Sequence, residues 1–143
     1  CNLYQILYLS IMNIKSSKEL VEEANQQIKT LSPEEVKSLE KKGEVTLIDV
    51  RDIRELWKEG TLKNSIHIPR GMLEFWLDPQ SSYFQEKKMS NVKNIVLFCA
   101  LGFRSALATK ALKDMGFKNV ANAKGGFDAL KNAGIEVVQK EKK

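Results

Sequence analysis

Histidine and cysteine are scarce in this sequence. His67 is the only histidine, and Cys1 and Cys99 are the only cysteines among 143 residues. A structural zinc site needs about four His or Cys ligands at short spacings, and a disulfide scaffold needs several cysteine pairs in a short chain. The sequence therefore predicts neither a metal site nor a disulfide framework.

Long apolar runs and basic clusters are missing as well. No run approaches the roughly 18 residues of a membrane span. The net charge of +5 is scattered along the chain, and its longest basic patch is the tail at residues 140–143. Scattered charge is typical of a protein that is kept soluble by its surface, and nucleic-acid binders concentrate it on one face. We expect a cytoplasmic protein with no nucleic-acid or membrane partner, and a periplasmic location is the alternative.

The N-terminal residues differ from the rest of the chain. Residues 1–12 are mildly apolar, do not begin with methionine, and lack the basic start and cleavage site of a signal peptide. We interpret residues 1–15 as an extension that is poorly ordered or loosely docked. Two alternatives stay open, a true start at Met12 and a lipid on Cys1. Residues 16–143 are expected to form one domain with a single core.

Helical and strand patterns alternate through residues 16–143. Helix start signals stand at Ser32, which is followed by Pro33 and Glu35, and at Asp52, which is followed by Glu55. The predicted helices span residues 17–26, 33–42, 53–59, 71–77, 104–115 and 127–132. The predicted strands span residues 28–31, 45–50, 65–68, 94–98 and 118–121. This alternation indicates an α/β fold with a parallel sheet covered on both faces, in which ligands bind at the carboxyl ends of the strands.

The segment C-A-L-G-F-R-S at residues 99–105 is the strongest candidate for chemistry. Cys99 follows an unbroken apolar strand and precedes a predicted helix, so its thiol lies at a carboxyl end of the sheet. Three features favour the reactive thiolate there: N–H groups of a tight loop, the positive end of the helix, and the guanidinium of Arg104. Gly102 gives the loop its backbone freedom, and the hydroxyl of Ser105 can reach the sulfur or cap the helix. A buried structural cysteine is the alternative reading.

Two further motifs accompany this loop and complete a family pattern. L-I-D-V-R stands at residues 47–51 and is followed by I-H-I-P at residues 66–69, and N-V-A-N-A-K-G-G-F stands at residues 119–127. With these motifs in this order, residues 28–137 resemble a single-domain rhodanese-like domain of the sulfurtransferases. The resemblance implies a three-layer α/β/α fold with a central, mostly parallel five-stranded sheet.

The resemblance also implies a mechanism. The Cys99 thiolate would take a sulfane sulfur from a thiosulfate-like or persulfide donor, become a persulfide, and pass the sulfur to cyanide, a thiol or an acceptor protein. Arg104 would hold the anionic part of the donor, and no cofactor would be needed. The protein would act as a monomer or a weak homodimer. The backbone that would cradle the persulfide is that of Ala100, Leu101, Gly102, Phe103, Arg104 and Ser105.

Two other functions compete with sulfur transfer. One is an interaction or persulfide-carrier module without enzymatic activity. The other is phosphatase or arsenate-reductase chemistry, whose loops place five residues between cysteine and arginine. Four residues separate Cys99 from Arg104, which favours sulfur over a phosphoryl group. The chain also departs from the family pattern at Thr61, where members often have histidine, and at Leu130, where an aromatic is usual. Ala100, Leu101 and Phe103 of the loop are uncharged, whereas family enzymes that prefer thiosulfate often have basic residues there. We therefore expect thiosulfate to serve as an assay substrate and do not assign it as the physiological donor.

Other residues near the predicted strand ends have two readings. Asp49 and Arg51 could line the site behind the loop. The favoured interpretation is that they form a structural ion pair at the end of their strand, because a buried charge must be paired. His67 is expected to be structural, because a stabilised thiolate needs no base. A set of apolar residues before the polar loop is expected to pack at the core or rim, or to form a wall over the pocket: Met72, Phe75 and Trp76.

Overall fold

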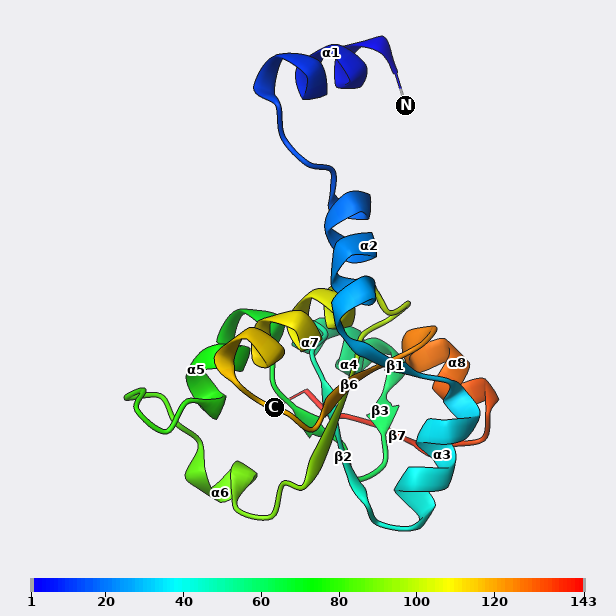
Figure 1. Ribbon diagram of the computed structural model, residues 1–143. Coiled ribbons are helices and arrows are strands. Elements are labelled where there is room, and N and C mark those ends of the chain that lie inside the picture. The colour runs from blue at the N-terminus through cyan, green and yellow to red at the C-terminus, as the bar shows by residue number, and fades with distance from the viewer. Residues whose placement is uncertain (1, 143) are drawn as a thin grey trace.

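The computed structural model describes residues 2–142, without the side chain of Leu9. The hypothesis of a lipid on Cys1 therefore lies outside the described residues. Helix α1 (Leu3–Met12) stands away from the sheet, beyond the segment that leads into α2 (Ser17–Gln27), as Figure 1 shows. Within residues 2–142, no helix has both the length and the apolar character that crossing a membrane requires.

Five strands form one sheet in which every neighbouring pair is parallel. Their spatial order is β1-β6-β5-β2-β4, so the apolar strand before Cys99 is the central one. The strands are β1 (Lys29–Leu31), β2 (Val45–Asp49), β4 (Ile66–His67), β5 (Asn94–Phe98) and β6 (Val120–Ala123). The α/β class and the five-stranded sheet predicted from the sequence are confirmed.

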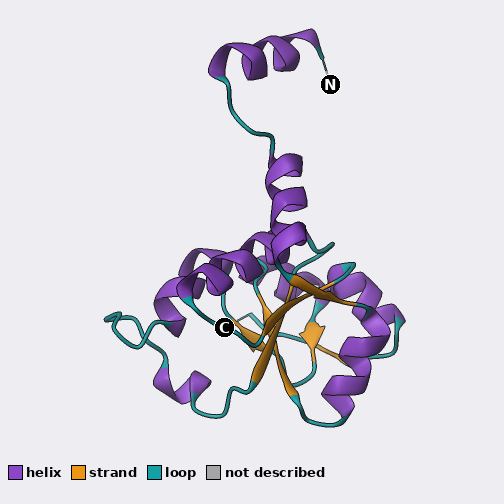
Figure 2. Cartoon of the chain, in the orientation of Figure 1, coloured by secondary structure: helices purple, strands orange, loops and turns teal. Residues whose placement is uncertain are grey.

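Helices cover both faces of the sheet, as Figure 2 shows. The remaining helices are α3 (Pro33–Lys41), α4 (Ile53–Glu59), the 3-10 turn η1 (Arg70–Met72), α5 (Leu73–Leu77), α6 (Glu86–Met89), α7 (Phe103–Met115) and α8 (Gly126–Asn132). Both predicted capping boxes form, with Ser32 before α3 and Asp52 before α4. These local signals fix where the helices begin because they satisfy the first N–H groups of each helix.

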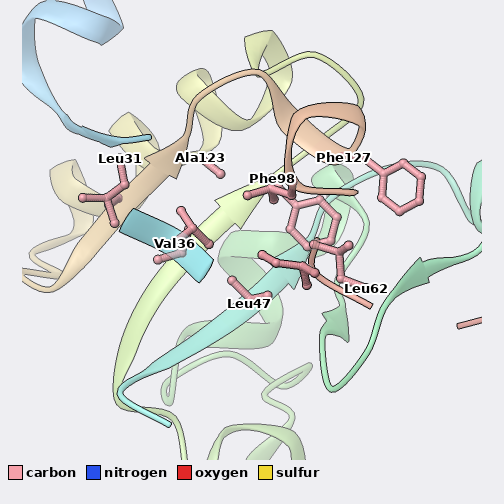
Figure 3. Close-up of a cluster of buried hydrophobic side chains, with 11 residues drawn as sticks. Leu31, Val36, Leu47, Leu62, Phe98, Ala123 and Phe127 are labelled. Carbon is pink, nitrogen blue, oxygen red and sulfur yellow. The ribbon is translucent and has the colours of Figure 1, made fainter. Parts of the chain in front are cut away.

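The core divides into two layers because side chains alternate along each strand. Val96 and Phe98 of β5 belong to the layer that contains residues of α3 and α8, which Figure 3 shows around Phe98. Leu97 belongs to the opposite layer, together with residues of α5 and α7, and so does Cys99. The thiol therefore faces the α7 side of the sheet.

Several details differ from the sequence-based expectations. β6 begins two residues later than predicted. A second, antiparallel sheet, which the sequence did not predict, pairs β3 (Thr61–Leu62) with β7 (Val137–Val138). Strands this short carry no periodic signal in the sequence. In α5, the side chains of Leu73 and Leu77, which lie one turn apart, are buried. Phe75, which the sequence suggested as part of the core, the rim or a wall over the pocket, is 50% exposed. Met115, the last residue of α7, is 43% exposed.

Candidate active site

Cys99 lies where the central strand ends at the carboxyl edge of the sheet. The strand β5 closes at Phe98, whose carbonyl accepts a hydrogen bond from the N–H of Val50 on the neighbouring chain segment. The side chain of Cys99 is 1% exposed. This is the position that the sequence predicted, at the edge where parallel sheets bind their ligands.

Main-chain donors converge on the sulfur of Cys99. The N–H of Gly102 lies 3.1 Å from Sγ, the N–H of Ser105 lies 3.4 Å from it, and the Ser105 hydroxyl lies 3.3 Å from it. Gly102 has a φ of 104°, a left-handed conformation that glycine adopts at little cost. The first turn of α7 begins at the next residue. Together these groups surround Sγ with donors in the arrangement of an anion nest.

Arg104 turns its guanidinium to Glu55 of α4. Nη1 and Nη2 donate to the two carboxylate oxygens at 2.9 and 3.0 Å. Glu55 also accepts a hydrogen bond from the N–H of Asp52 as part of the capping box. The Arg104 hydrogen bonds lower the pKa of Glu55, and the same pair raises the pKa of Arg104. The only cation of the predicted loop is therefore already paired with a carboxylate, which the sequence analysis had identified solely as a helix cap.

The Cys99 loop rests on the start of α8. The N–H of Phe127 donates a 2.7 Å hydrogen bond to the carbonyl of Cys99. Gly126 has a φ of 66°, and a Cβ there would lie 2.5 Å from the carbonyl oxygens of Cys99 and Ala100. The second glycine of the G-G-F motif is thus required by both its backbone conformation and the close approach of the loop.

Asn122 of β6 also contacts the loop. Its side-chain Nδ2 donates a 3.2 Å hydrogen bond to the carbonyl oxygen of Gly102. The sequence analysis did not single out this residue, although it stands within the third motif.

Asp49 and Arg51 form a buried ion pair on the other side of the sheet. Both side chains are fully buried, and their closest nitrogen–oxygen distance is 2.8 Å. The Thr61 hydroxyl donates to Asp49 at 2.8 Å, and Arg51 donates to the Gly60 carbonyl and lies 4.2 Å over the ring of Phe127. Asp49 shares the face of Leu47, opposite to Cys99. This arrangement favours the structural reading, with Thr61 as a hydroxyl partner where family members often have histidine.

His67 also makes a structural contact. Its Nε2 lies 2.7 Å from the carbonyl oxygen of Arg51 and links β4 to the segment after β2. Within residues 2–142, no group of three or more His, Cys, Asp or Glu side chains could hold a metal ion.

The rim of the loop is apolar and exposed. Leu101 is 57% exposed and Phe103 is 60% exposed, on either side of Gly102. Of the residues that the sequence suggested as a wall, Phe75 meets Tyr83 edge to face, with 6.4 Å between ring centroids. Trp76 packs against the α7-side core. The loop that carries the thiol therefore exposes two apolar side chains beside Gly102.

A separate hollow of about 660 Å³ lies at the opposite end of the sheet. It is lined by residues at the amino ends of the strands, such as Lys29 and Asn94, and by Phe117 after α7. Cys99 is not among its lining residues. The candidate active site is therefore the small nest at Cys99.

Comparison with known proteins agrees with this geometry. A family model described as rhodanese-like domain matches residues 32–133. The chain belongs to the rhodanese-like domain family. The matched residues include the whole Cys99 loop, the Asp49–Arg51 pair and the two glycines at the start of α8.

Two solved structures resemble this rhodanese-like domain over most of its length. A protein of unknown function from Rhodopseudomonas palustris, described as a possible tyrosine phosphatase, is 42% identical with a TM-score of 0.80, over 87% of this chain and 95% of that chain. The polysulfide-sulfur transferase homodimer of Wolinella succinogenes is 34% identical with a TM-score of 0.66, over 86% of this chain and 87% of that chain.

A curated relative has a further activity. The tRNA uridine(34) hydroxylase of Prochlorococcus marinus is 39% identical over 84 residues. These residues are 57% of this chain but 26% of the hydroxylase. The chain thus spans about a quarter of that relative's length.

Proposed function

We propose that the protein is a sulfurtransferase of the thiosulfate:cyanide type, in which the Cys99 thiolate carries the transferred sulfur. The observation that carries this proposal is the convergence of the Gly102 and Ser105 N–H groups on Sγ. Such donors, with the positive end of a 13-residue helix behind them, stabilise an anion on sulfur without a cofactor.

The transfer has two half-reactions. First, the Cys99 thiolate attacks the sulfane sulfur of the donor, a sulfur–sulfur bond to Cys99 forms, and the donor's bond to that sulfur breaks. The leaving group keeps the electron pair and departs as sulfite from thiosulfate or as a thiolate from a persulfide. Second, cyanide, a thiol or a protein thiol attacks the outer sulfur, and Cys99 is released as the thiolate. No external oxidant or reductant is consumed.

Family relationships support sulfur transfer in particular. The polysulfide-sulfur transferase of Wolinella succinogenes matches this chain over most of both proteins. The relationship to the tRNA uridine(34) hydroxylase covers only a small part of that enzyme. We therefore propose sulfur transfer, and not hydroxylation, as the reaction of this protein.

The surroundings of the thiol point to the class of donor. Arg104 is bound by Glu55 through two hydrogen bonds, so a dianion such as thiosulfate must compete with a carboxylate for it. Leu101 and Phe103 give the rim an apolar, exposed surface. An organic persulfide or thiosulfonate with an apolar body can contact this rim without breaking the ion pair. We propose such compounds as better donors than thiosulfate.

Phosphatase activity is the second candidate, because the similar protein of Rhodopseudomonas palustris is described as a possible tyrosine phosphatase. Two features weigh against it. The loop has four residues between Cys99 and Arg104, and Arg104 is turned to Glu55. A phosphatase would need the guanidinium to face a phosphoryl group above the thiol.

Steady-state assays distinguish these candidates. We expect transfer of sulfur from benzenethiosulfonate to cyanide, measured as thiocyanate, and complete loss of transfer in Cys99→Ser. Hydrolysis of an aryl phosphate should be absent in both proteins. Cys99-dependent phosphate release without thiocyanate formation would support the phosphatase instead. Labelling of Cys99 without turnover for any acceptor would support the carrier module.

A further inference from the structure

Asn122 presents a buried amide group to the loop that carries the thiol. The residue is 3% exposed and pairs in register with Leu97, two residues before Cys99. Its Nδ2 donates to the carbonyl of Gly102, whose own N–H donates to Cys99 Sγ. A single glycine thus links the Asn122 side chain to the sulfur.

The hydrogen bond from Asn122 sets the direction of a second N–H group. In a trans peptide group, the carbonyl oxygen and the following N–H point in opposite directions. Because the Gly102 carbonyl points to the buried amide of Asn122, the N–H of Phe103 points away from Asn122. Phe103 is the first residue of α7, and the first N–H groups of a helix have no acceptor within it.

The presence of an asparagine at position 122 is not explained by a contribution to the stability of the fold. Its Oδ1 is buried and has no hydrogen-bond partner among residues 2–142, and an unpaired buried acceptor costs free energy of folding. The Gly102 carbonyl does not need the amide either, since the N–H of Ala106 donates to it at 3.2 Å. An apolar side chain at this position would serve the fold at least as well, and local departures of this kind are expected at functional sites.

We propose that Asn122 is a positioning residue for sulfur transfer. Its amide binds the carbonyl of the Gly102–Phe103 peptide group, so that the N–H of Phe103 faces the site of the outer sulfur. By fixing this side of Gly102, the amide also keeps the N–H of Gly102 facing Cys99 Sγ. The role of the Phe103 N–H rests on the proposed function, because only a persulfide has an outer sulfur. The role of the Gly102 N–H concerns the thiolate alone.

The test is the pH dependence of Cys99 alkylation by iodoacetamide in Asn122→Leu. Without the amide, the Gly102 carbonyl is held only by the N–H of Ala106, so Gly102 can turn its N–H away from the sulfur more readily. We expect the pH at which half of the maximal alkylation rate is reached to rise by about 0.5 to 1 unit. Transfer from benzenethiosulfonate should fall about tenfold, while the melting temperature stays the same or rises. Thr61→Val, the loss of a buried hydroxyl that donates to Asp49 on the other side of the sheet, should leave the alkylation profile unchanged.

The outcomes separate the positioning role from the proposed function. An Asn122→Leu profile equal to that of the parent protein would overturn the positioning role, whether or not the melting temperature falls. A shifted profile in a protein that transfers no sulfur from any donor would keep the positioning of the thiolate and reject the sulfurtransferase. If Asn122→Leu does not fold, Asn122→Ala, which removes the amide without adding bulk, is measured in the same way and judged by the same criterion.

Discussion

Cys99 and the Asp49–Arg51 ion pair occupy comparable places at the carboxyl edge of the sheet. They differ in which groups donate hydrogen bonds to the Asp49 carboxylate and to the Cys99 sulfur. Their strands are neighbours, and Asp49 pairs in register with Phe98. Asp49 receives donors from Arg51 and Thr61 and is fully buried with its counter-charge. Cys99 is also buried, but it receives the main-chain N–H groups of Gly102 and Ser105, in a loop that exposes Leu101 and Phe103. Under the proposed function, a place at this edge is not sufficient for reactivity, which also requires donors that a ligand can share.

The comparison is tested most strongly by removing one member of the ion pair. Arg51→Met leaves the Asp49 carboxylate buried without its counter-charge, so we expect a loss of about 3–5 kcal/mol in the free energy of unfolding. Urea denaturation measures this loss. The double variant Asp49→Leu with Arg51→Met removes both charges and should recover most of the stability. Equal destabilisation in the single and double variants would show that the pair is not held by charge.

The support of the Cys99 loop by α8 gives the next largest effect. Gly126→Ala places a Cβ 2.5 Å from two loop carbonyls at a φ of 66°, so we expect more than about 2 kcal/mol of destabilisation together with loss of sulfur transfer. Gly43 is a matched control, since its φ is 67° and a Cβ there has no neighbour within 4 Å. Gly43→Ala should cost about 1 kcal/mol and leave transfer intact. Equal effects of the two substitutions on transfer would contradict the proposed support.

A smaller effect is expected from the carboxylate that holds Arg104. Glu55→Gln keeps the capping box but removes the charge that pairs with the guanidinium. Since a partly exposed ion pair contributes about 1 kcal/mol or less, kcat/KM for thiosulfate should rise about two- to fivefold, with little change for benzenethiosulfonate. Arg104→Ala should lower kcat/KM for thiosulfate by a similar factor. A fall for thiosulfate in Glu55→Gln would mean that the carboxylate assists the dianion instead of competing with it.

The smallest effect is the pH dependence of this ion pair. The pKa of Glu55 is lower in the folded protein than its ordinary value of 4.5, chiefly because of the Arg104 hydrogen bonds. The pair therefore contributes its full stabilisation above about pH 4.5, and this contribution is lost as the pH falls through the lower pKa of the folded state. Urea denaturation between pH 6 and pH 3 should show a shallower loss of stability in Glu55→Gln than in the parent protein. Identical slopes would argue against the pair.

Features set by local signals were predictable from the sequence. The Ser32 and Asp52 capping boxes, the apolar run of β5 and the loop after it depend on residues close together in the chain, and the structure has them at the expected places. β3 and β7 were missed because two-residue strands carry no periodicity.

Features of the site that depend on distant residues were not predictable. Glu55 and Arg104 are 49 positions apart, and Asn122 is 20 positions from Gly102. Their contacts arise only when parallel strands bring successive carboxyl ends together. The sequence located the thiol and its loop, but the partner of Arg104 had to come from the structure.

The most direct measurement of the central claim is the intact mass of the protein after incubation with benzenethiosulfonate and removal of excess donor. The proposed mechanism predicts a gain of about 32 Da, one sulfur atom, on Cys99. Added cyanide should remove the gain, and Cys99→Ser should never show it. An unchanged mass with every sulfur donor, in protein whose Cys99 still reacts with iodoacetamide, would contradict the mechanism.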